Sequence, residues 1–145
     1  MIDNNLQSKI EIIFSKLDEL VPLYGANPAD AFAEGNVAVC ILDEAGNWVG
    51  KIWGTDKAKA RRFAELAWKK ASQVWVTGMK TGEFERKLFN GEVNEEDYGI
   101  SAPDLIGWEG GQPITLSDGT KLSVGFSGFR GINDLEIVVK ACENL

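Results

Sequence analysis

The stretch VGFSGFRGINDLE, residues 124–136, places three glycines three residues apart, with a serine and an arginine between them. Glycines at this density can bring a backbone close to a phosphate, and a serine between small residues can act as a nucleophile. A dinucleotide loop needs Gly-x-Gly-x-x-Gly inside a βαβ unit, and a P-loop needs Lys followed by Ser or Thr. Gly125, Gly128 and Gly131 have neither pattern, so the sequence does not predict a nucleotide site here.

The same stretch also lacks the pattern of a nucleophile elbow. That motif is Gly-x-Ser-x-Gly, and Phe129 stands where the second glycine belongs. The chain contains no histidine, which removes the usual base of a serine nucleophile and the commonest ligand of zinc and non-haem iron. We interpret the stretch as a turn from a strand into a helix. Contact of Phe129 and Arg130 with a ligand is the alternative.

Apolar periodicity predicts the elements that position this turn. A β-hairpin is the clearest, with strands over 37–42 and 48–53 separated by a turn that contains Gly46. The other expected elements are a helix over 4–25, a helical turn capped by Asn27, a long helix capped by Asp56 or Thr55 and running to about Trp75, a short helix ending at Gly91, strands within 104–128, and a last helix capped by Asn133. Hairpin connections favour an antiparallel sheet covered by helices, and 145 residues are expected to form one domain, 1–145.

The net charge of −7 excludes a general nucleic-acid binder, which needs a basic surface. One segment, DKAKARRFAELAWKK, departs from this acidic balance on a single predicted helix. Its cations are Lys57, Lys59, Arg61, Arg62, Lys69 and Lys70. They form either the solvated face of an amphipathic helix or a site for an anionic ligand or an acidic partner.

No apolar run is long enough to span a bilayer, and the N-terminal residues lack the pattern of a secretory signal. Cys40 and Cys142 have no metal-ligand spacing and are expected to be free thiols. We therefore expect a cytosolic protein with no membrane partner and no metal.

The order of motifs in the C-terminal third resembles the GlcG/HbpS family of haem-binding proteins, whose domain is also called PduO C-terminal-like. The matching elements are a double glycine before Pro-Ile, an Asp-Gly turn, a strand ending in Gly-x-Ser-Gly, and an acidic helix start. In this sequence they are Gly110, Gly111, Pro113, Ile114, Asp118, Gly119, Gly125, Ser127, Gly128 and Asp134. Two upstream segments also resemble the family. They are the hairpin segment VAVCILDEAGNWVGKIWG and the A-x-x-K-A element at Ala67, Lys70 and Ala71.

The resemblance implies an α/β (α+β) fold, a profilin-like sandwich with a central antiparallel sheet of about five strands flanked by helices. It also implies a homo-oligomer that binds a small-molecule ligand, with haem or another tetrapyrrole as the cofactor. Because the chain has no histidine, an imidazole axial ligand is excluded. Met79, Tyr24, Tyr98 or a cysteine would have to ligate the iron, or haem would be held by apolar contact.

A binding module of this kind would use aromatic walls and a cation. The candidate ligand-binding residues are Lys70, Trp75, Met79, Trp108, Phe129 and Arg130. The alternative function is a cofactor-independent enzyme that acts on a small organic acid or carbonyl compound in a pocket at a subunit interface. Its acid and base would come from Asp104, Glu109, Asp134, Lys70, Tyr24 and Tyr98. An accessory subunit without a ligand of its own is a third hypothesis.

Overall fold

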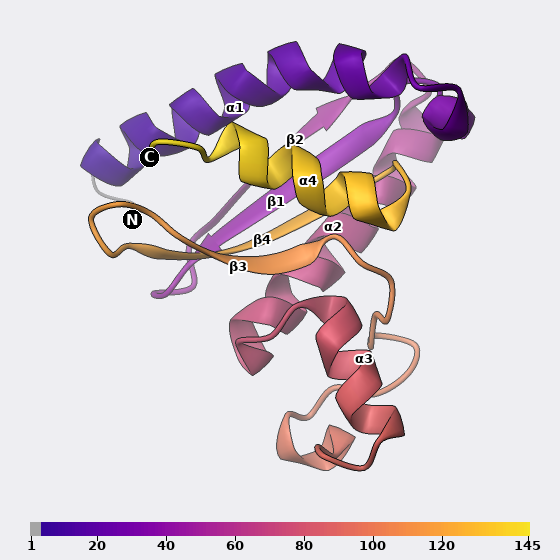
Figure 1. Cartoon of the computed structure of the whole chain (residues 1–145), viewed down its shortest axis with the longest axis vertical. Helices are drawn as coiled ribbons and strands as arrows, with labels where there is room; N and C mark the ends of the chain where they lie inside the picture. Colours follow the sequence, from indigo (N-terminus) through magenta and orange to yellow (C-terminus); the bar gives the residue numbers. More distant parts are fainter. Residues whose placement is uncertain (1–3) are drawn as a thin grey trace.

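The chain folds around an antiparallel sheet of four strands in the order β2-β1-β4-β3 (Figure 1). The computed structural model describes residues 4–145. The strands are β1 (Val37–Asp43), β2 (Trp48–Trp53), β3 (Gly111–Thr115) and β4 (Lys121–Ser127). The mixed fold with an antiparallel sheet flanked by helices is confirmed, although the sheet has four strands where about five were expected.

Two helices, α1 (Asn4–Gly25) and α4 (Gly131–Ala141), lie side by side on one face of the sheet (Figure 1). The odd-numbered positions of β1 and the even-numbered positions of β4 point to this face. Apolar burial drives the packing of this layer. Its buried side chains include Ile13, Leu17, Val37, Val39, Ile41, Leu122, Val124, Phe126, Ile137 and Val138.

The other face is covered by α2 (Lys57–Thr77), which lies very close to the sheet. Small residues make this approach possible. Ala67 and Ala71 of α2 are fully buried, and Gly125 of β4 has no side chain to separate the two backbones. A Cβ at Gly125 would lie 2.2 Å from the carbonyl oxygen of Ala67. The small side chains of α2 and the glycine in β4 thus allow the same close contact between helix and sheet.

Local signals account for most element ends. Asn27 caps the 3-10 helix η1 (Pro28–Ala33), and Asp56 caps α2 by accepting the Lys59 N–H at 3.1 Å, as predicted. The expected short helix is α3 (Thr81–Phe89), followed by η2 (Glu95–Asp97). No helix in the described part of the chain has both the length and the apolar character to span a membrane.

Two local predictions were wrong, each because a side chain binds elsewhere. The segment 104–110 is not a strand, since the side chain of Gln73 satisfies both polar backbone groups of Ile106, at 2.8 Å each. Asn133 is not a cap, because α4 begins at Gly131 and the Asn133 amide donates to Asp30 Oδ2 at 2.6 Å.

Candidate functional site

Lys70 is buried inside the molecule, with 2 % of the residue exposed. Its ammonium donates to the carbonyl oxygen of Phe126 at 2.9 Å and to Asp134 Oδ2 at 3.4 Å. Asp134, in the first turn of α4, is equally buried, and its other oxygen accepts the Phe129 N–H at 2.9 Å. The Lys70–Asp134 pair therefore ties α2 to the start of α4 next to the end of β4.

Burial shifts both partners toward their neutral forms. It raises the pKa of Asp134 to about 7, opposing the Lys70 charge and the hydrogen bond from Phe129. Burial likewise lowers the pKa of Lys70, against the favourable charge of Asp134. A Cβ at Gly110 would lie 2.7 Å from Lys70 Nζ, so the pair is closely packed. In this arrangement the pair holds α2, the end of β4 and the start of α4 together.

Asp134 is expected to make stability depend on pH. Its folded-state pKa of about 7 lies above the unfolded value of about 4, so folding strengthens proton binding. This contribution to the free energy of unfolding is complete below about pH 4 and is lost as the pH rises through about 7. Urea unfolding of the wild type, relative to Asp134→Asn, should show a falling stability over this range. A difference that does not change with pH would contradict the burial of this carboxyl group.

Arg130 is held by Asp30 of η1. The buried Asp30 carboxylate accepts the backbone N–H of Arg130 at 2.8 Å and its Nε at 3.2 Å. Burial raises the pKa of Asp30, but the hydrogen bonds from Arg130 and Asn133 outweigh this effect, and the pKa lies below its ordinary value. Phe129 beside it is 5 % exposed and its ring stacks between Phe126 and Tyr24. Phe129 and Arg130 therefore make these contacts inside the protein, just before α4 begins.

The other three predicted ligand-binding residues lie apart from these. Trp75 covers Gly46 and lines a hollow of about 610 Å³ between the end of α2 and β3–β4. Met79 follows α2, and Trp108 is 68 % exposed on the loop before β3. The structure therefore brings Lys70, Phe129 and Arg130 close to Asp134, but it does not bring the six residues into one pocket.

An apolar groove runs between the edge strand β2 and α2, and we call it the Trp48–Trp68 groove. Its volume is about 430 Å³. The rings of Trp48 and Trp68 lie with centroids 5.0 Å apart, and they are tilted by 54°. These residues are 62 % and 39 % exposed, and Ile52 is 51 % exposed. The lining residues are Val39, Cys40, Trp48, Gly50, Lys51, Ile52, Ala64 and Trp68.

The groove exists because α2 packs mainly over β1 and β4 and leaves the same face of β2 uncovered. Alternation along β2 points Trp48, Gly50 and Ile52 to this face, opposite Leu42, Cys40 and Ala38 of β1. Gly50 contributes no side chain, so the space between Trp48 and Ile52 stays open. Exposed aromatic side chains around a concave apolar surface are typical of a ligand or partner site.

Sequence reasoning did not single out Trp48 and Trp68. They are separated along the chain and come from a strand and a helix, so only the tertiary fold brings them together. One signal was present: WVGKIW alternates large apolar residues with small or polar ones and has glycine at its centre. That pattern predicts a strand with one apolar face interrupted at Gly50.

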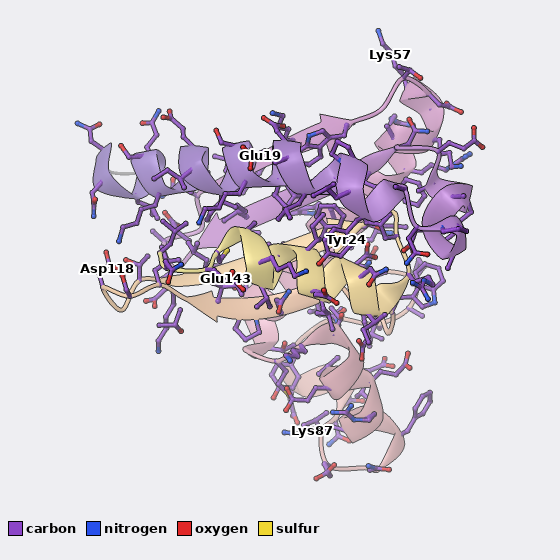
Figure 2. The ribbon with its side chains drawn as sticks, turned by 45° about the horizontal axis from the view of Figure 1, so that its top comes forward. Glu19, Tyr24, Lys57, Lys87, Asp118 and Glu143 are labelled. Carbon is purple, nitrogen blue, oxygen red and sulfur yellow. The ribbon has the colours of Figure 1, made fainter. Side chains whose placement is uncertain are left out.

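The residues that line the groove can be compared with the ligands that a haem iron needs. Among the residues that line it, Cys40 offers the one sulfur atom, in a thiol whose pKa burial raises to about 12. Of the other predicted ligands, Tyr24 donates its hydroxyl to Glu136 at 2.8 Å, where α1 faces α4 (Figure 2). Tyr98 packs its ring on Phe84. Residues 4–145 contain no cluster of three or more acidic or cysteine side chains that could hold a metal ion.

An antiparallel sheet between helix layers, with an aromatic groove at its edge, defines a small α+β domain suited to binding a small molecule. The family model described as haem degrading protein HbpS-like matches residues 25–143, and the chain belongs to this family. This confirms the resemblance inferred from the glycine motifs. The comparison with curated proteins found no match.

Three solved structures share the fold. PduOC in its complex with haem is 20% identical, with a TM-score of 0.66 over 95% of this chain and 92% of that one. The Klebsiella pneumoniae protein ORFY is 16% identical, with a TM-score of 0.69 over 94% and 87%. A double mutant of Streptomyces reticuli HbpS is 21% identical, with a TM-score of 0.57 over 86% and 84%.

Proposed function

We propose that this protein binds a flat, largely apolar small molecule in the Trp48–Trp68 groove, and that haem or another tetrapyrrole is its ligand. The observation that carries the proposal is the pair of exposed tryptophans, 5.0 Å apart, beside the open space over Gly50. Two aromatic faces provide large contact areas with little conformational freedom to lose on binding.

Family membership and the haem complex of PduOC support a tetrapyrrole over other flat ligands. In this chain the indole rings would contact the faces or edges of the ring, and Ile52 and Ala64 would exclude water from it. When bound, haem would supply the redox and ligand-binding chemistry of its iron. Cys40, the one sulfur in the lining, is buried and its raised pKa keeps the thiol protonated, so haem would be held mainly by apolar contact with the groove. A homo-oligomeric state and a cytosolic location stay predictions.

A haemin titration of Trp68→Ala tests the site. We expect the wild type to give a saturable Soret change at micromolar haemin, and the variant to bind at least tenfold more weakly, because one wall of the groove is lost. Trp68 is partly exposed, so its removal should leave the fold intact; the far-ultraviolet circular dichroism spectrum checks this.

Trp108→Ala is the matched control, because Trp108 is equally aromatic and more exposed but lies outside the groove. It should bind haemin as the wild type does. Equal affinity of Trp68→Ala and the wild type would remove the groove as the haem site, and a wild type that shows no saturable change would remove haem as the ligand.

A further inference from the structure

We infer that the ligand of the Trp48–Trp68 groove is an organic acid whose anionic group is held by Arg61 and Lys57 at the amino-terminal end of α2. This inference rests on the proposed function and names the chemical class of the ligand. The apolar part of the ligand would lie against the two tryptophans, over Gly50, and its charged part would lie beyond Ile52.

Helical spacing places the two cations in line with the groove. Ala64 and Trp68, which line it, lie four residues apart on one face of α2. Arg61 precedes Ala64 by three residues and Lys57 precedes Arg61 by four, so all four residues follow the same stripe. A link of three residues, 54–56, joins β2 to α2, so the cationic end of the stripe is the end of α2 that follows β2.

Neither cation is paired with a carboxylate in the described part of the chain. Lys57 and Arg61 are exposed and form no ion pair with a carboxylate of residues 4–145. Lys57 extends from the end of α2 at the margin of the molecule (Figure 2). Nearby lysines differ: Lys51 pairs with Asp18 at 2.7 Å and Lys59 with Glu34 at 3.5 Å.

The position of these cations is unfavourable for the helix itself. The amino-terminal turn of a helix carries partial positive charge and normally attracts acidic residues. The first turn of α2 contains no acid, and it begins with Lys57. Asp56 caps this end of α2 by accepting the Lys59 N–H, and the exposed side chains of Lys57, Arg61 and Arg62 give it a local excess of positive charge in a chain of net charge −7.

The proposal requires both the groove and the two cations, because the cations alone would be an ordinary solvated helix end. The apolar walls bring a ligand close to Arg61, whose planar guanidinium can make two parallel hydrogen bonds to a carboxylate or sulfonate. A neutral ring of the same shape would gain the apolar contacts alone. The groove should therefore discriminate between an acid and its uncharged analogue.

Two fluorescent probes that share the same ring system test this discrimination. Anilinonaphthalene sulfonate carries an anionic group and N-phenylnaphthylamine does not. We expect the double variant Lys57→Gln/Arg61→Gln to bind the sulfonate about tenfold more weakly than the wild type and to bind the neutral probe within twofold of it. Added salt should weaken sulfonate binding to the wild type and have little effect on the double variant.

Arg62→Gln is the control, since Arg62 is the next residue along the helix, is also exposed and points away from the stripe. Unchanged sulfonate affinity in the double variant, or an equal loss for both probes, would overturn the inference. Trp68→Ala separates the two proposals: it should weaken both probes, and if it weakens neither, the groove itself is not the site.

Discussion

Replacing Asp134 by alanine is expected to lower the free energy of unfolding by about 3–5 kcal/mol, the usual cost of removing one partner of a buried ion pair. The substitution leaves the Lys70 ammonium with the Phe126 carbonyl as its remaining hydrogen-bond partner in the structure. It also removes the acceptor of the Phe129 N–H. Urea denaturation at neutral pH, followed by tryptophan fluorescence, measures the loss.

A double variant separates the charge from the hydrogen bond. Lys70→Met/Asp134→Asn removes both charges and keeps a side-chain oxygen that can accept the Phe129 N–H. We expect it to recover most of the stability that Asp134→Ala loses, so the double-mutant cycle should show strong coupling between the two positions. Additive losses would contradict the assignment of Lys70 and Asp134 as a mutually dependent pair.

Replacing Gly125 by alanine is expected to lower the free energy of unfolding by about 3 kcal/mol or more, because α2 must move away from the sheet. The added Cβ would lie 2.2 Å from the Ala67 carbonyl oxygen and 2.6 Å from the Ala71 nitrogen. Both are backbone atoms of a helix packed along its length, so no side-chain rotation relieves the contact. Thermal and urea unfolding measure the effect.

Gly25→Ala is a suitable control for that experiment. A Cβ there would meet Phe129 at 3.9 Å, an ordinary contact, and Gly25 does not have a positive φ. We expect a change within about 0.5 kcal/mol, as for most substitutions that disturb no packing. If Gly125→Ala is as stable as Gly25→Ala, the close approach of α2 to β4 is wrong.

The fold was largely readable from the sequence because its strongest signals are local. The hairpin over β1 and β2 follows from two β-rich runs and a glycine-containing turn, and the caps at Asn27 and Asp56 follow from short polar side chains before apolar periodicity. The glycine stretch was interpreted correctly as a turn into α4, and Gly125 in addition sets the distance between β4 and α2.

Signals that depend on distant residues could not be read in this way. Gln73 binds the backbone of Ile106 from 33 residues away, which removes the expected strand, and Asp30 takes the amide of Asn133 that was expected to cap α4. The same limit applies to the groove. Trp48 and Trp68 look like independent core residues in the sequence, and they form a site because β2 lies at the edge of the sheet beyond the cover of α2.

The most direct test of the proposed site is the response of the five tryptophan indole N–H signals in a nitrogen-15 correlation spectrum. Single Trp→Phe variants assign the signals, and gallium protoporphyrin, a diamagnetic analogue of haem, serves as the ligand. The groove predicts that the signals of Trp48 and Trp68 shift in a saturable manner while those of Trp53 and Trp108 stay in place. Shifts centred on Trp108 or Trp75, with Trp48 and Trp68 unchanged, would contradict a tetrapyrrole site in the groove.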